Sequence, residues 1–209
     1  MGTYRIVGGR PLHGHVPIHG AKNSVLPILA ATLVTGGVCE LHNCPEISDV
    51  DDALELLRCL GCGAERTGTR IRVDASEAAP AELPAALGKR MRAAVLFLGA
   101  MLTRFSCAAL YHPGGCPLGR RPIDLHLRGL RLMGADCQYD GDALRCTAAA
   151  LQGCTLALPF PSVGATENLL LAALGCAGEV VLCNAAREPE IADLIGFLRA
   201  CGAEIVGDG

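Results

Sequence analysis

A single cysteine, Cys116, lies in a part of the chain that is rich in glycine, proline and positive charge. The segment reads YHPGGCPLGRRPIDLHLRGL from Tyr111 to Leu130, and Arg120 and Arg121 follow the cysteine closely. Glycines make such a loop adaptable, prolines stiffen parts of it, and neighbouring cations favour the thiolate form of a cysteine. The composition therefore predicts an exposed lid loop that carries a reactive thiol. The alternative is a glycine-rich turn with an incidental surface cysteine.

Polar and cationic residues also stand before three apolar stretches of the chain. They are Lys22 and Asn23, then Lys89, Arg90 and Arg92, then Thr166, Glu167 and Asn168. An apolar stretch of this kind predicts a buried helix, and the free N–H groups at a helix start favour phosphate. Lysine and arginine would add charge-assisted donors. Three helix starts that meet would therefore form an anion site, whereas each residue taken alone is as well explained as a cap or a solvated surface charge.

These residues recur because the chain contains an internal repeat of about 70 residues. The segment GAKNSVLPILAATLVTGGVCELHNCPEISDVDDALELLRCLGCGAE from Gly20 matches GATENLLLAALGCAGEVVLCNAAREPEIADLIGFLRACGAE from Gly164, and a more diverged copy lies between them. Asp49, Asp124 and Asp193 mark the three copies at spacings of 75 and 69 residues. Repetition at a fixed period indicates three like structural units.

Each copy predicts an apolar helix, a strand, an amphipathic helix and a closing hairpin, which is an α/β fold. The apolar helices, expected at the centre of the domain, are Val25–Val34, Ala93–Leu102 and Leu169–Leu174. The second helices are amphipathic and should pack on sheet. Their C-terminal caps are expected at Gly63, Gly134 and Gly202, with positive φ, and a hairpin turn is expected at Asp140-Gly141. Three such units about a pseudo-threefold axis would bring the starts of the inner helices to one end.

The composition argues against several classes of protein. A net charge of -3, 3% aromatic residues and no basic run argue against nucleic-acid binding. The clean apolar stretches, about ten residues long, are too short to span a bilayer, and MGTYRIVGGR lacks the core of a signal peptide. We therefore expect a cytoplasmic protein that binds neither nucleic acid nor membrane.

The 12 cysteines have irregular spacings and are expected to be reduced, mostly as small buried hydrophobic residues. Cys59 and Cys62, with His42 and Cys44 upstream, could form half of a zinc site. A second pair at matching spacing is missing, however, and Cys59 falls on the apolar side of an expected helix. No metal is therefore expected.

Four segments together resemble the UDP-N-acetylglucosamine 1-carboxyvinyltransferases, a family of enolpyruvyl transferases. They are GAKN at Gly20–Asn23, PGGCPLGRRPIDLH at Pro113–His126, SVGATEN at Ser162–Asn168 and NAAREPEI at Asn184–Ile191. The resemblance implies an inside-out α/β barrel, with three repeated units, inner helices and outer sheets. It also implies transfer of the enolpyruvyl group of phosphoenolpyruvate to the 3′-hydroxyl of UDP-N-acetylglucosamine, with release of phosphate and without a cofactor. This reaction is the first committed step of peptidoglycan synthesis.

The resemblance assigns roles to individual residues. Cys116 would be the lid cysteine that protonates the methylene carbon of phosphoenolpyruvate and reacts with fosfomycin. Lys22 and Arg121 would hold the phosphate of phosphoenolpyruvate, with Asn23 beside them, and Arg92 would contact the nucleotide sugar. The segments that would line the uridine-diphosphate site are Arg121, Pro122, Ile123, Asp124 and Leu125, and Ser162, Val163 and Gly164.

The resemblance also implies a domain organisation. Members of the family have two halves of three repeats each, with the active site in the cleft between them. Residues 21–209 would be one half, and residues 1–20 would pack on the second half, which this sequence lacks. That half would supply an aspartate near the sugar hydroxyl and the arginines that hold the carboxylate of phosphoenolpyruvate. We therefore expect a truncated form with little or no activity alone, and self-association through the surface left bare.

Two other functions stay open at this stage. One is half of a shikimate-pathway enolpyruvyl transferase, which shares the repeat fold. The other is a non-catalytic module that binds a nucleotide sugar.

Overall fold

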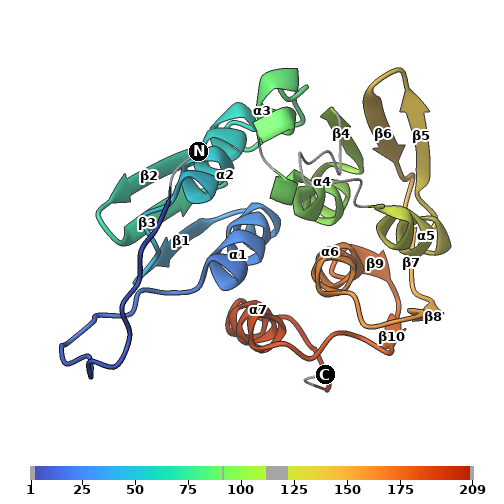
Figure 1. Cartoon of the computed structure of the whole chain (residues 1–209). Helices are drawn as coiled ribbons and strands as arrows, with labels where there is room; N and C mark the ends of the chain where they lie inside the picture. The colour runs from blue at the N-terminus through green and yellow to red at the C-terminus, as the bar shows by residue number, and fades with distance from the viewer. Residues whose placement is uncertain (1–2, 91, 112–121, 208–209) are drawn as a thin grey trace.

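The computed structural model describes residues 3–90, 92–111 and 122–207, and for residues 89, 90, 92 and 93 it describes the backbone alone. Three units succeed one another along the chain, with helices at the middle of the molecule and strands outside them (Figure 1). No helix in the described ranges is long and apolar enough to cross a membrane.

The first unit contains the complete set of expected elements. Its inner helix is α1 (Lys22–Thr35), followed by β1 (Val38–Leu41), α2 (Ser48–Cys59) and the hairpin β2 (Gly63–Thr67) and β3 (Arg70–Asp74). The three strands form an antiparallel sheet in the order β1-β3-β2, so the return strand of the hairpin is central.

The second unit repeats this arrangement. Its elements are α3 (Ala85–Arg90), the 3₁₀ segment η1 (Arg92–Leu96), α4 (Phe97–Phe105), β4 (Cys107–Tyr111), α5 (Asp124–Leu132), β5 (Asp136–Asp140) and β6 (Ala143–Thr147). The sheet order β4-β6-β5 again places the return strand at the centre. The hairpin turn expected at Asp140-Gly141 lies one residue later, at Gly141 (φ 58) and Asp142, because Asp140 still pairs with Ala143. The inner helix expected at Ala93–Leu102 is instead η1 followed by α4, because its first turn takes the tighter 3₁₀ form that is common at helix starts.

The third unit differs from the other two in its strands. Its elements are β7 (Leu151–Gln152), β8 (Thr155–Ala157), α6 (Val163–Ala173), β9 (Cys176–Ala177), β10 (Val181–Cys183) and α7 (Pro189–Ala200). The strands form two parallel pairs, β10-β8 and β7-β9. The inner helix begins at Val163, earlier than the expected Leu169, because the Ser162 hydroxyl caps it by accepting the N–H of Ala165.

The second helices end in the same way in all three units, but not always at the expected glycine. Gly134 and Gly202 have positive φ (94 and 99), as expected. In the first unit the left-handed residue is Gly61 (φ 82) and not Gly63. The prediction for Gly63 was wrong because that residue already begins β2 and pairs with Asp74.

The inner helices form the centre of the core, as predicted. Leu29 of α1, Leu98 of α4 and Leu171 of α6 are all 0% exposed. The second helix of the third unit closes the ring against the first unit, where the Ser24 hydroxyl donates to Asp193 Oδ2 at 2.6 Å. This arrangement of inner helices and outer sheets is an inside-out α/β barrel of three units.

Helices α4 and α6 approach each other closely at a glycine. The N–H of Gly99 donates to Asn168 Oδ1 at 2.7 Å, and a Cβ at position 99 would collide with the main-chain carbonyl oxygen of Asn168. Main-chain atoms on both sides cannot move aside as a flexible side chain would.

We therefore expect Gly99→Ala to lower the free energy of unfolding by about 2–3 kcal/mol, through overpacking. The control is Gly196→Ala on the exposed face of α7, where a Cβ meets nothing within 4 Å. That change should raise stability by about 0.5–1 kcal/mol, because alanine is the better helix former. Denaturant unfolding of both variants is the measurement, and equal effects would contradict the close-approach interpretation.

Candidate active site

The starts of the inner helices open onto one pocket of about 610 Å³. The pocket is also reached by the starts of α2, α5 and α7, so six elements from all three units contribute to it. Its lining residues are Lys22, Asn23, Leu26, Pro27, Asp49, Val95, Leu96, Pro122, Ile123, His126, Ser162, Val163, Gly164, Glu167 and Glu190. The predicted convergence of the helix starts at one end is therefore confirmed.

Lys22 and Asn23 at the start of α1 both have acidic partners. The Lys22 ammonium pairs with Asp49 Oδ1 at 2.6 Å, and their side chains are 48% and 32% exposed. The Asn23 amide donates to Glu190 Oε1 at 3.1 Å. The Asp49 carboxylate thus holds Lys22 at the pocket. An anionic ligand would have to displace this carboxylate or share the Lys22 ammonium with it.

The start of α6 forms the opposite wall. Ser162, Val163 and Gly164 line the pocket there, and the N–H groups of a helix's first turn lack intrahelical partners. A Cβ at Gly164 would lie 3.5 Å from His126 Cε1, so the imidazole ring packs against the α6 backbone. The helix start and the ring therefore form one continuous surface.

Two buried titratable side chains line this pocket. Glu167 is 4% exposed, and its burial, with the nearby carboxylates of Glu190 and Glu188, raises the pKa of its carboxyl to about 8. Burial lowers the pKa of the His126 imidazole to about 4, although the nearby Asp124 acts in the opposite direction. Both groups are therefore neutral near pH 7, and among the described residues the buried His126 Nδ1 has no hydrogen-bond partner.

The structure brings together seven of the residues predicted to form the site. They are Lys22, Asn23, Pro122, Ile123, Ser162, Val163 and Gly164. Asp124 and Leu125 do not line the pocket, because Asp124 is exposed on the first turn of α5 and Leu125 faces the core. Arg92 is placed by its backbone at the start of η1, and Cys116, Arg120 and Arg121 lie outside the described residues.

Two of the polar residues near the start of α6 have structural roles. The Thr166 hydroxyl accepts the N–H of Ala186 at 3.0 Å, and the side-chain oxygen of Asn168, Oδ1, accepts the N–H of Gly99. Only Glu167 of this group faces the pocket. Helical periodicity separates the three, because adjacent residues of a helix point in different directions.

Several lining residues were not among the predicted site residues. They are Leu26, Pro27, Asp49, Val95, Leu96, His126 and Glu190. Helical spacing would have found two of them, because Leu26 and His126 lie three residues after Asn23 and Ile123. Asp49 and Glu190 come from other elements, and no local spacing connects them to the site.

The cysteines within the described ranges are all free. Cys44 and Cys62 are buried, and burial raises the pKa of the Cys62 thiol to about 11. Within those same ranges, no cluster of three or more His, Cys, Asp or Glu side chains could hold a metal ion.

The raised pKa of Glu167 makes stability depend on pH. Between 4.5 and about 8 the folded protein keeps a proton that the unfolded chain has released, so stability should fall as the pH rises through this window. Glu167→Gln should remove that slope, with a difference of at most about 1.4 kcal/mol per pH unit. The exposed Glu65→Gln should leave the slope unchanged. Urea unfolding at several pH values measures it, and parallel curves for the Glu167→Gln variant and the parent protein would contradict the assignment.

Comparisons with known proteins agree with this geometry. The family model of EPSP synthase (3-phosphoshikimate 1-carboxyvinyltransferase) matches residues 6–209. UDP-N-acetylglucosamine 1-carboxyvinyltransferase 2 of Caldanaerobacter subterraneus subsp. tengcongensis is 46% identical over 209 residues, which cover 100% of this chain and 50% of the relative. The UDP-N-acetylglucosamine 1-carboxyvinyltransferase of Acidiphilium cryptum is 46% identical over 210 residues, with the same two coverages. The chain thus spans about half the length of the curated relatives it matches.

Solved structures share the fold. The enolpyruvyl transferase NikO from Streptomyces tendae superposes with a TM-score of 0.85 at 27% identity, covering 97% of this chain and 48% of that one. EPSP synthase from Acinetobacter baumannii gives a TM-score of 0.74 at 22% identity, covering 94% and 45%. The family model matches residues 6–209, almost all of this chain, and the NikO structure shares its three-unit barrel. This chain therefore belongs to the EPSP synthase (3-phosphoshikimate 1-carboxyvinyltransferase) family.

Proposed function

We propose that this chain forms one wall of an active site that transfers the enolpyruvyl group of phosphoenolpyruvate to the 3′-hydroxyl of UDP-N-acetylglucosamine. The observation that carries the proposal is the pocket of about 610 Å³, where the inner-helix starts gather seven of the predicted residues. The names of the relatives that match the whole chain support the choice of the acceptor sugar over shikimate phosphate. The reaction belongs to peptidoglycan synthesis, and we place it in the cytoplasm.

The chemistry requires a proton donor and a clamp for the leaving phosphate. Protonation of the methylene carbon of phosphoenolpyruvate leaves an oxocarbenium-like carbon, which the sugar hydroxyl attacks to give a tetrahedral adduct. Loss of a proton from the new methyl group and departure of phosphate then regenerate the enol. Cys116 is the proposed donor, which would also make it the target of fosfomycin, and Lys22 and Arg121 are the proposed clamps.

The described wall suits an anionic substrate through its dipoles more than through its charge. The first turn of α6 presents N–H groups that lack partners within the helix, and such groups favour phosphate. Glu167, protonated near pH 7, adds no negative charge to the pocket. Lys22 supplies a cation that Asp49 holds in place. A bound phosphate would then accept part of the hydrogen bonding of the Lys22 ammonium in place of Asp49.

A second globular half would complete this site. Residues 3–19 have no regular secondary structure and are exposed, and their apolar side chains, such as Leu12 at 96% exposure, contact little. Apolar side chains left this bare support docking on another surface. We propose that residues 1–20 pack on that second half and that residues 21–209 form the three-unit domain. Without the second half, the bare surface would favour self-association.

The Lys22–Asp49 pair leads to a test of anion binding. Lys22→Ala should weaken binding of phosphoenolpyruvate by about tenfold, because a charge-assisted hydrogen bond is lost. Asp49→Asn should strengthen binding, because the competing carboxylate is removed. Isothermal titration of both variants, with inorganic phosphate as a second ligand, measures these changes. If both variants weaken binding equally, the pair is structural and the proposed clamp fails.

Activity of the chain alone provides the second test. We expect little or no phosphate release from phosphoenolpyruvate and UDP-N-acetylglucosamine, because cooperating catalytic groups lose nearly all turnover when some are absent. Addition of the second half of a relative should restore release, and Cys116→Ala should abolish the restored activity. Cys183→Ala is the matched control, since that thiol is exposed and lies outside the pocket. Steady release by the chain alone that survives Cys116→Ala would contradict the proposal.

A further inference from the structure

Two cysteines face each other across the hairpin of the second unit. Cys137 in β5 and Cys146 in β6 are direct partners in the antiparallel ladder, and the hairpin lies at the outside of the molecule (Figure 1). Both side chains turn inward, since Cys137 is 2% and Cys146 is 0% exposed. Among the described strands, no other two cysteines are partners in a ladder.

This position in the ladder has the geometry that a disulfide needs. The hairpin has a two-residue turn after Asp140, so its closing pair, Asp140 and Ala143, is hydrogen-bonded. Hydrogen-bonded and non-hydrogen-bonded pairs alternate along the ladder, which makes the fourth pair, Cys137 and Cys146, a non-hydrogen-bonded one. The Cα atoms of such a pair are about 4.5 Å apart, and the side chains approach closely. A disulfide spans Cα distances of about 4.4–6.8 Å, so it can form here with little movement of the strands.

The two thiols already interact with each other. Their hydrogen bond lowers the pKa of the Cys137 thiol, against the effect of burial, and the guanidinium of Arg131 lowers it further. The same hydrogen bond raises the pKa of the Cys146 thiol, and burial acts in the same direction. Arg131 also donates to the carbonyl oxygen of Cys137 at 2.7 Å, which holds the cation beside this part of β5. Cys137 is therefore the thiol that forms the thiolate, and the thiolate is the form that attacks an oxidant.

The first unit shows that the fold does not require these thiols. Its hairpin has the same length and register, and its fourth pair is Ala64 and Val73, which are 5% and 0% exposed. Arg58 donates to the carbonyl oxygen of Ala64 at 2.8 Å, as Arg131 does to that of Cys137. Alanine and valine thus pack at the equivalent place, so packing alone does not require two cysteines in the second unit.

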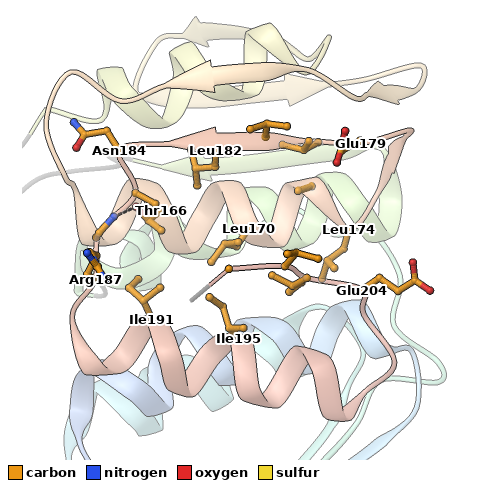
Figure 2. Close-up of a pocket in the computed structure, with 18 of the residues that line it drawn as sticks. Thr166, Leu170, Leu174, Glu179, Leu182, Asn184, Arg187, Ile191, Ile195 and Glu204 are labelled. Carbon is orange, nitrogen blue, oxygen red and sulfur yellow. Dashed lines mark hydrogen bonds between the residues drawn. The ribbon is translucent and has the colours of Figure 1, made fainter. Parts of the chain in front are cut away.

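The third unit has no hairpin of this kind among its described strands. Its strand β10 pairs with β8 and borders a groove of about 660 Å³, with Leu170, Leu182 and Ile195 on the walls (Figure 2). The described cysteines of this unit are Cys154, Cys176, Cys183 and Cys201. They face no cysteine across a ladder in the described strands, so they serve as internal controls for the specificity of oxidation.

The edge position of β5 gives an oxidant access to the buried pair. The sheet order is β4-β6-β5, so in the described sheet β5 pairs with β6 alone. Cys137 is also the one buried residue of β5. Little apolar surface therefore holds this strand, and local opening of such a strand costs less free energy than global unfolding. A small oxidant can reach both thiols in the open state.

We propose that Cys137 and Cys146 form a dithiol that hydrogen peroxide oxidises to a disulfide, and that this disulfide ties the edge strand β5 to β6. The Cys137 thiolate attacks one peroxide oxygen, the O–O bond breaks, and Cys137 becomes a sulfenic acid while hydroxide leaves. The Cys146 sulfur then attacks the sulfenic sulfur, its proton leaves with the hydroxyl group as water, and the S–S bond forms. The proton that Cys137 released joins the hydroxide. One hydrogen peroxide thus gives two waters, and the two thiols lose two electrons.

This chemistry is separate from the proposed transfer reaction. Neither Cys137 nor Cys146 lines the candidate active site. The proposed proton donor, Cys116, belongs to another segment of the chain. Oxidation of the hairpin can therefore be measured without a substrate.

Treatment of the folded chain with hydrogen peroxide tests the proposal. After alkylation, non-reducing peptide mapping should show a disulfide within the chain between Cys137 and Cys146. The bond closes a loop of about ten residues, so the oxidised chain should have a Tm about 5 °C higher than the reduced chain. Amide exchange of β5 should slow by about tenfold, and a thiol reductant should reverse both changes.

The matched control copies the pair of the first unit. The double variant with Cys137→Ala and Cys146→Val carries the residues that Ala64 and Val73 supply at the equivalent place, so it should fold in the reduced state. Hydrogen peroxide should leave its Tm and the amide exchange of β5 unchanged, although its other ten cysteines are still present.

Three results would overturn the proposal. One is a treated chain that lacks the bond between Cys137 and Cys146, or that first forms a bond elsewhere, such as between Cys154 and Cys176. Another is a bond between Cys137 and Cys146 that leaves Tm unchanged or lowers it, since strain would then cancel the constraint. The third is an equal rise of Tm in the double variant. None of these measurements uses a substrate, so their failure is distinct from failure of the proposed reaction.

Discussion

The contact between Gly99 and Asn168 fixes the distance between α4 and α6, and with it the geometry of the inner ring. No side chain separates the two main chains there, and the Gly99 N–H is saturated by the Asn168 side chain. The Thr103 hydroxyl adds a bond to the carbonyl oxygen of Leu171 at 2.9 Å one turn further along. Because η1, which leads into α4, and the start of α6 both line the pocket, the separation of the two helices sets the distance between the walls that face a ligand. Packing this close transmits any shift of one helix to the other.

An anion site needs oriented dipoles and positive charge, and the described wall of the pocket supplies mainly the dipoles. Its rigid helix starts offer oriented dipoles, and its buried titratable groups, Glu167 and His126, stay neutral near pH 7. Fixed dipoles cost little to reorganise when charge develops in a ligand. The cations expected from the sequence, apart from Lys22, are Lys89, Arg90 and Arg92 and, further along the chain, Arg120 and Arg121.

Much of this organisation could be predicted from the sequence, because it follows from periodicity. The repeat, the apolar inner helices and the meeting of their starts need only local patterns and a common axis. The errors arose where distant residues decide the outcome. Gly63 and Gly61 are both compatible with a helix end, and only the pairing of Gly63 with Asp74 distinguishes them. The partner of Lys22, and the burial that protonates Glu167, likewise depend on elements far away in the chain.

The hydrogen bond between Ser24 and Asp193 has a consequence for how the domain is synthesised. It joins residues 169 positions apart, between the first inner helix and the last helix. While the chain emerges from a ribosome, α1 can bury its faces toward α2 and α4, but its face toward α7 stays uncovered until Pro189–Ala200 has been made. Late closure exposes apolar surface during translation, and contacts of such long range form slowly. The face of α1 that carries Ser24 is therefore among the last surfaces of the domain to be covered during synthesis.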